Sequence, residues 1–280
     1  MEEQRDAGKR GYLNENFRLF HLKDSRAEKM DYHYHEFDKI VLMLRGKVTY
    51  VVEGVRYFLQ PWDILLVPHN MIHVPLIDPS EPYERIVIWC SGDYLQRLSP
   101  PEEPLATCFE TARARNFLLL REDKERWLHY MRLLGDLEES LCSREFGHAL
   151  LTDSYFLQLL ISINRDSQKN RTADEARRCD PKMEEVLQYI SSHLEEDLTV
   201  EALAGRFYLS RYYLMHRFKA VTGYTLHQYI NQKRLLRAGE LLRAGVPVMK
   251  AAETAGFREY STFLRAFRGT FHASPRDFNT

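Results

Sequence analysis

Apolar residues change their spacing along the chain, from the short runs of strands to the three- and four-residue spacing of helices. Up to about residue 100, runs rich in β-branched and aromatic residues follow one another closely, and Gly46 and Gly54 mark turns between them. The runs are KIVLMLRGKVTYVVEGVRYFL, DILLVP, HVPLI and YERIVIWC. Several short strands without long intervening helices predict a barrel or a sandwich.

The spacing becomes helical after residue 105. Between 122 and 142, large apolar residues recur every three or four positions, and a second amphipathic stretch covers 146–164. We interpret 106–165 as a helical segment whose apolar stripes pack in a core or pair two chains. The polar range 166–180 predicts a linker, or at most an exposed helix end. From 181 to 280, helical patterns are separated by short turns marked by Gly or Ser.

The charge is distributed unevenly. The whole chain of 280 residues carries −1, whereas residues 181–280 hold 4 Lys and 10 Arg against 10 Asp or Glu, which leaves +4 there and −5 in the remainder. A basic C-terminal part indicates a polyanionic partner. The four cysteines lack the spacing of a metal site. The first residues are polar, unlike a signal peptide, and no apolar run approaches the roughly 20 residues of a membrane span. These features predict a cytoplasmic protein with free thiols.

One helical pattern is written twice in the C-terminal part, as LSRYYLMHRFKAVTG at 209–223 and REYSTFLRAFRGTF at 258–271. In each copy a capping position is followed four and eight residues later by buried-type apolar residues: Ser210, Leu214 and Phe218, then Glu259, Phe263 and Phe267. A short helix rich in small residues precedes each copy, and Gly256 suits the turn in the second. This arrangement predicts two helix-turn-helix units.

The second copy, with GF at 256–257 and Ser274-Pro275 after it, resembles the signature of the AraC/XylS family of transcription regulators. LTVEALA, the FK and TG pairs at 218–223, and YINQKRLLRAGELLRAG stand where that family has them, so the resemblance covers 182–278. It implies an α+β multidomain protein whose C-terminal all-α domain joins two helix-turn-helix units by one long helix. One monomer would then read two successive major grooves, about 34 Å apart.

The resemblance also implies which residues touch DNA. The residues expected to contact bases are Tyr212, Met215 and His216 in the first unit and Tyr260, Ser261, Thr262 and Arg265 in the second. The residues expected to contact phosphates are Arg211, Arg217, Lys219 and Arg268. Because Met215 is apolar, we expect it to contact a thymine methyl group.

The N-terminal part resembles the cupin barrel, through YHYHEFDKIVLMLRG and WDILLVPHNMIHVP. His33, His35 and His73 would share the interior and have the chemistry to bind Zn²⁺ or Fe²⁺. However, Lys39 stands where metal-binding cupins have a carboxylate, and Trp62 and Asn70 replace two glycines. We therefore expect His33, His35, Lys39 and His73 to contact a small-molecule effector, with Glu36, Glu53 or the ligand as partner of Lys39.

The function predicted is a sequence-specific, effector-responsive transcription regulator that binds double-stranded DNA and assembles as a homodimer. A sugar and an organic acid are both compatible effectors, and RNA polymerase is a partner if the protein activates. The domains expected are a cupin-like barrel at 1–105, a dimerisation segment at 106–165, a linker at 166–180 and the DNA-binding domain at 181–280. No catalytic residue, metal, cofactor or membrane is expected. Two alternatives stay open: a metal-dependent cupin enzyme fused to a DNA-binding domain, and an effector-free regulator whose barrel only dimerises.

Overall fold

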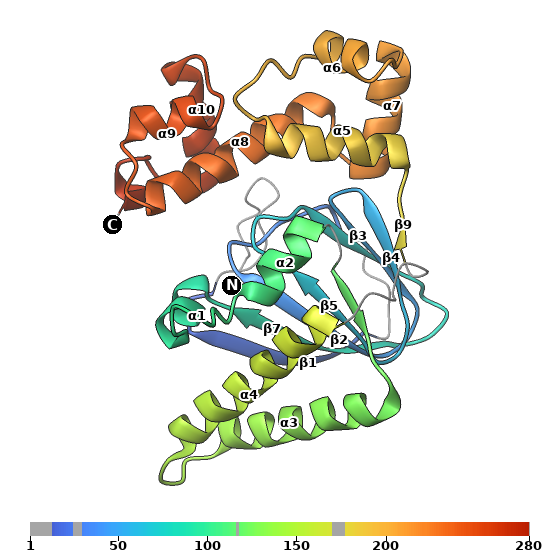
Figure 1. Cartoon of the computed structure of the whole chain (residues 1–280), viewed down its shortest axis with the longest axis vertical. Coiled ribbons are helices and arrows are strands. Elements are labelled where there is room, and N and C mark those ends of the chain that lie inside the picture. The colour runs from blue at the N-terminus through green and yellow to red at the C-terminus, as the bar shows by residue number, and fades with distance from the viewer. Residues whose placement is uncertain (1–12, 25–29, 116–117, 170–176, 280) are drawn as a thin grey trace.

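The computed structural model describes residues 13–24, 30–115, 118–169 and 177–279. A β-domain forms the N-terminal half, and a pair of helical units lies above it (Figure 1). The polar N-terminal residues and most of the expected linker, 170–176, lie outside the described residues. Among the helices of the described ranges, none combines the length and apolar character needed to cross a bilayer.

Two antiparallel sheets face each other in the β-domain, with strand orders β1-β7-β2-β5-β8 and β6-β3-β4-β9. The central strand β2 is buried along most of its length, because helices α2 and α4 contribute side chains to the same apolar core. Strand β4 instead alternates buried and exposed residues, as expected where one face meets solvent. The strands are β1 Phe17–Asp24, β2 Asp38–Arg45, β3 Val48–Val52, β4 Val55–Leu59, β5 Asp63–Val67, β6 His73–Ile77, β7 Tyr83–Cys90, β8 Leu119–Arg121 and β9 Arg177–Arg178.

The turns of this domain have left-handed backbone at the places that the sequence marks. Gly46 and Gly54 have φ of 110° and 79°. Trp62 and Asn70, which replace glycines of the cupin pattern, have φ of 80° and 61°. The backbone geometry of those turns is thus retained with side chains that ordinarily avoid it.

Four helices accompany the sheets: α1 Gly92–Leu98, α2 Thr107–Arg115, α3 Lys124–Cys142 and α4 His148–Lys169. The expected helical segment therefore also contains the strand β8, which pairs with β5. Helix α4 continues to Lys169, into the range expected as linker. The reason is Asp166, which is buried and accepts hydrogen bonds from the Tyr130 hydroxyl at 2.5 Å and from Arg126 of α3.

The C-terminal domain consists of two helix-turn-helix units that share helix α8. Leu226, Tyr229 and Ile230 at its start pack in the core of the first unit. Leu235, Ala238 and Leu242 pack in the core of the second unit. The helices are α5 Pro181–Ser192, α6 Val200–Arg206, α7 Arg211–Thr222, α8 Leu226–Arg243, α9 Val248–Thr254 and α10 Tyr260–Phe271, followed by a short 3₁₀ turn at Asp277–Asn279.

Local backbone geometry fixes the two ends of α7, the first recognition helix, and the turn that precedes α10, the second. The Ser210 hydroxyl accepts a hydrogen bond from the Tyr213 amide, and Gly223 closes α7 with φ of 78°. In the second unit, Gly256 lies in the turn between α9 and α10 with φ of 94°. A Cβ there would lie 2.0 Å from the Leu194 carbonyl oxygen of the first unit. Only glycine lets the two units approach this closely.

We predict that Gly256→Ala destabilises the protein more than Gly245→Ala does. Both positions have positive φ, which costs an alanine about 1–2 kcal/mol, but only at Gly256 would the new methyl group meet backbone. Urea unfolding of the full chain measures the two changes in free energy. Equal losses in the two variants would show that the close approach to Leu194 contributes nothing.

Candidate ligand site and nucleic-acid interface

Three buried imidazoles and one ammonium group converge inside the β-domain. His33 and His35 lie on the segment before β2, Lys39 on β2, and His73 at the start of β6. The Lys39 Nζ lies 2.8 Å from the His73 Nε2 and 3.3 Å from the His35 Nε2. The ring centroids of His33 and His73 are 4.4 Å apart. We call these four residues the His–Lys cluster, and they are the residues that the sequence assigned to the effector.

Backbone carbonyls set the protonation of two of the imidazoles. The Nδ1 of His33 is 2.8 Å from the Asp31 carbonyl oxygen, and the Nδ1 of His73 is 2.9 Å from the Met71 carbonyl oxygen. In both rings Nδ1 must donate, so the neutral rings present Nε2 as an acceptor. Burial lowers the pKa of His73 well below its usual value, and the charge of Lys39 lowers it further. His73 is therefore a neutral acceptor near pH 7.

The cluster has part of the donor set of a metal site and lacks the rest. One ligand nitrogen from each of the three histidines lies within 4.8 Å of the others, which suits a divalent metal. The Lys39 ammonium, however, already interacts with two of these nitrogens, and a fixed cation in that position repels another. The His–Lys cluster, with Lys39 among its ligand nitrogens, therefore does not fit a metal ion.

The two carboxylates that the sequence offered as partners of Lys39 also pair with the DNA-binding domain. Glu36 pairs with Arg243 of α8 at 2.9 Å, and Glu53 pairs with Lys233 of α8 at 2.9 Å. Both are contacts between the two domains. No sequence pattern signals them, because each joins residues about 180 or more positions apart.

The interior near the cluster is aromatic. Phe37 stacks on Trp89 with ring centroids 4.5 Å apart and on His35 at 4.6 Å. The Lys39 Nζ also lies 5.7 Å from the centre of the Tyr50 ring. Flat apolar faces beside polar groups suit a small ligand with both C–H and O–H surfaces.

The predicted base-reading residues form exposed faces on α7 and α10. Leu214 and Phe218 of α7, and Phe263 and Phe267 of α10, are fully buried, so the opposite faces point to solvent. Tyr212 is 76% exposed and its ring stacks on His216 at 6.0 Å. The exposed candidates are Arg211, Tyr212, Met215, His216, Arg217, Lys219, Tyr260, Ser261, Thr262, Arg265 and Arg268.

Two of the predicted phosphate contacts are engaged within the protein. The Arg217 guanidinium donates to the Asp180 carboxylate, the N-cap of α5, at 2.5 Å. Burial raises the pKa of Asp180, but this hydrogen bond outweighs burial and holds that pKa below its usual value. Arg211 pairs with Glu201 of α6 at 3.1 Å, but both side chains are about two-thirds exposed. Arg211 can therefore exchange its partner for a phosphate easily, whereas Arg217 also holds α7 against α5.

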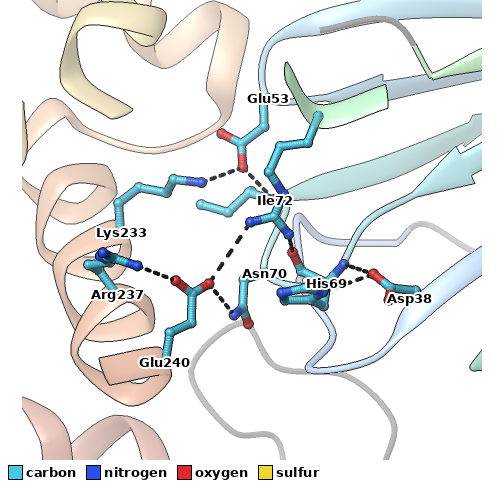
Figure 2. A network of polar contacts seen from close by, with 9 residues as sticks. Asp38, Glu53, His69, Asn70, Ile72, Lys233, Arg237 and Glu240 are labelled. Atoms are coloured by element: carbon cyan, nitrogen blue, oxygen red, sulfur yellow. Dashed lines mark hydrogen bonds and ion pairs between the residues drawn. The ribbon is translucent and has the colours of Figure 1, made fainter. Parts of the chain in front are cut away.

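Sequence reasoning missed the residues that join the two domains. Figure 2 shows Lys233 of α8 pointing at Glu53, and Glu240 of the same helix pointing at Asn70. The Asn70 amide donates to Glu240 at 3.0 Å. Although burial raises the pKa of Glu240, this hydrogen bond and nearby cations hold it below its usual value. A cavity of about 770 Å³ lies between the domains beside these contacts.

Comparison with known proteins supports both halves of this description. A family model described as an AraC-like ligand binding domain matches residues 19–160, just over half of the chain, and one described as a helix-turn-helix domain matches 203–280. The HTH-type transcriptional activator RhaS of Salmonella arizonae (strain ATCC BAA-731 / CDC346-86 / RSK2980) is 26% identical over 253 residues, which cover 88% of this chain and 86% of that protein. RhaS of Klebsiella pneumoniae (strain 342) is 26% identical over 258 residues with the same coverage.

Solved structures similar to this chain include a DNA-binding domain and a longer chain that matches along nearly all of this one. The DNA-binding domain of AdpA, solved in complex with a target DNA, is 34% identical and covers 36% of this chain and 90% of its own, with a TM-score of 0.34. ToxT from Vibrio cholerae is 16% identical over 94% of this chain and 97% of its own, with a TM-score of 0.39. Together with the family models, the paired helix-turn-helix units and the β-domain place this chain in the AraC/XylS family of transcription regulators, with a ligand-binding N-terminal domain and a DNA-binding C-terminal domain.

Proposed function

We propose that the protein is an effector-responsive transcriptional activator that binds its effector at the His–Lys cluster and its operator through α7 and α10. The observation that carries the proposal is the convergence of His33, His35, Lys39 and His73 on one buried point, on a domain joined to two exposed recognition helices. Its curated relatives of similar length are activators, which supports activation through RNA polymerase in the cytoplasm.

The tautomers of the cluster favour a hydroxyl-rich effector, such as a sugar, over a simple carboxylate. In the neutral rings the Nε2 atoms of His33 and His73 are acceptors, because their Nδ1 atoms donate to backbone carbonyls. The Nε2 of His73 lies 2.8 Å from Lys39, so a ligand hydroxyl there would replace the ammonium. Ligand hydroxyl groups can donate to such nitrogens, whereas carboxylate oxygens only accept. Lys39 supplies a donor, and the Trp89 and Phe37 rings offer flat faces of the kind that pack on sugar C–H groups.

A thermal-shift screen that compares sugars and polyols with carboxylic acids of matched size tests this choice of effector. Stabilisation of the protein by acids alone would contradict it.

We propose two recognition surfaces on DNA rather than one. Arg265 lies on the exposed face of α10, between the buried Phe263 and Phe267, so its guanidinium is presented outward. Tyr212 and His216 have the corresponding place on α7. The guanidinium can donate two hydrogen bonds to one guanine, which is a direct reading of a base.

We also propose that α3 and α4 mediate a homodimer. Large apolar side chains remain exposed on these helices and on the connection between them, which project away from the β-domain in Figure 1. They are Leu128, Leu141, Phe146, Leu150, Leu151 and Ile161. A second copy of the chain would cover this surface, which a monomer rarely leaves exposed.

We predict that the wild-type cluster binds no stoichiometric metal and that Lys39→Ala does. Removing the ammonium leaves three histidine ligands and room for water, a set that suits Zn²⁺ or Co²⁺. Titration with Co²⁺, followed by visible absorption, should give a tetrahedral spectrum in Lys39→Ala that is lost when His73→Gln is added. Stoichiometric metal in the wild-type protein, lost in His73→Gln, would instead support the metal-dependent enzyme.

Arg265→Ala should weaken binding to an operator selected from random DNA by about 1–3 kcal/mol and relax the preference at one base pair. Tyr212→Ala should change the preference one turn of DNA away. Arg211→Ala removes a phosphate contact. It should therefore weaken binding to all DNA sequences alike and lower the slope of log Kd against log salt concentration by about one. Fluorescence anisotropy of the full chain on specific and scrambled duplexes, across a salt series, measures all three. Unchanged sequence preference in both Arg265→Ala and Tyr212→Ala would contradict reading by two helices.

Leu150→Arg should convert the dimer into a monomer, because a charge would then lie in the apolar contact. Sedimentation velocity of the full chain at tens of micromolar measures the change, a range generous for an interface above the usual ~1,000 Å². Leu76→Arg is the matched control, since Leu76 is also exposed but lies on β6. A monomeric wild-type protein would rule the dimer out.

A further inference from the structure

Two short segments of the β-domain, 31–35 and 70–74, lie side by side. His33 and His73 form an antiparallel bridge and exchange both backbone hydrogen bonds, at 2.9 and 2.8 Å. In extended chain, neighbouring side chains point to opposite faces. His33 and His73 therefore face the His–Lys cluster, whereas their neighbours Tyr32 and Ile72 face the DNA-binding domain.

Tyr32 touches the end of the first recognition helix. Its hydroxyl donates to the Val221 carbonyl oxygen at 3.4 Å, and the Tyr224 hydroxyl donates to the Tyr32 carbonyl oxygen at 3.1 Å. Its ring covers Gly223 so closely that a Cβ there would lie 2.2 Å from a ring carbon. Since Gly223 is the C-cap of α7, the bridge contacts that helix at the point where it ends.

Ile72 is part of the core of the first helix-turn-helix unit. Its side chain is 2% exposed and packs in the same apolar cluster as the buried residues of α5, α6, α7 and α8. The Ile72 amide donates to the Glu53 carboxylate at 2.8 Å. The same carboxylate pairs with Lys233 of α8 (Figure 2). It also accepts a hydrogen bond from the Tyr229 hydroxyl of that helix. Gly54, which follows Glu53, lies against side chains of α5 and α7.

The contacts between the β-domain and the second unit are of another kind. None of the buried residues in that unit's apolar core comes from the β-domain, within the described part of the chain. The end of α8 near that unit is held by the Glu36–Arg243 pair and by the contacts of Glu240 with Asn70 and Arg113. Ion pairs as exposed as these contribute about 0–1 kcal/mol each. The cavity between the domains adjoins both sets of contacts, since Tyr229 and Lys233 line it together with Arg113 and Glu240.

We propose that the 31–35 and 70–74 segments are a relay, which transmits the state of the His–Lys cluster to the first helix-turn-helix unit through Tyr32 and Ile72. This inference rests on the proposed function of the cluster as the effector site. A ligand that takes the Lys39 ammonium away from His73 changes the packing behind the bridge. The opposite face, which carries Tyr32 and Ile72, then moves against α7 and α8. The position of α10 stays unchanged.

Hydrogen exchange of the full chain tests the relay without DNA. Lys39→Met removes the ammonium but keeps the side-chain length, so it disturbs the cluster from within; His35→Gln is a second disturbance if Lys39→Met fails to fold. We expect amide exchange in the peptide 219–226 to become faster on the order of tenfold, and exchange in 260–271 to stay unchanged. The matched control is Arg121→Ala, which breaks the pair with buried Asp63 elsewhere in the β-domain. Unchanged exchange in 219–226, or the same change in Arg121→Ala, would overturn the relay.

A thermodynamic cycle on DNA supplies the second measurement. In the otherwise wild-type protein, Lys39→Met should change the Kd for the selected operator at least about threefold. In the Tyr32→Ala/Ile72→Ala protein the same substitution should change the Kd much less, because the cluster and the relay are coupled. In the control background Glu36→Gln the effect should persist. An equal effect in all three backgrounds would overturn the relay while leaving the proposed function intact. Absence of specific binding by the wild-type chain would instead contradict the proposed function, and the exchange measurement would still decide the relay.

Discussion

The burial of Ile72 inside the first helix-turn-helix unit is the contact on which the arrangement of this protein depends. A unit of a few short helices has little interior, so each large apolar side chain that it buries matters for its stability. Here one of those side chains comes from the β-domain, and Glu53 beside it satisfies polar groups of both domains. The first unit and the β-domain therefore share an interface of the interior type, whereas the second unit is attached to the β-domain by polar side chains.

This asymmetry places the two halves of the DNA-binding domain in different surroundings. Both units present an exposed recognition face, and both recognition helices begin after a residue with extended backbone, although only Ser210 caps its helix with a side-chain hydrogen bond. Only the first, however, ends its recognition helix under a side chain from the β-domain, Tyr32 over Gly223, among the residues that the structure describes. The bridge behind the cluster thus contacts α7 directly, while α10 is joined to the β-domain through α8.

The sequence predicted the features that short-range rules determine. The repeated spacing of Leu214, Phe218, Phe263 and Phe267 located both recognition helices, because residues four apart share one helix face. Gly256 has the positive φ that its turn demands. The cluster itself was also predicted, since the resemblance to the cupin barrel placed His33, His35, Lys39 and His73 on one interior.

The features that the sequence did not predict are those decided by tertiary pairing. Lys39 was assigned a carboxylate or the ligand as partner, but Glu36 and Glu53 pair with α8, and no periodicity encodes such a choice between distant residues. The end of α4 was placed too early because Asp166 and Ser167 resemble a polar linker, although Tyr130 and Arg126 bury the carboxylate. The short helices α1 and α2 lack a run long enough for their period to be read.

Helix α8 has one more consequence, which concerns the operator. Its 18 residues hold the cores of both units, and a helix of that length is a rigid rod about 27 Å long. The two recognition helices are thus spaced by a solid element and cannot adjust as they would on a flexible tether. One extra base pair between their half-sites would shift the second groove about 3.4 Å along the duplex and turn it about 34–36° away from α10. The protein should accordingly be strict about helical phasing within a site while remaining tolerant of the bases in between.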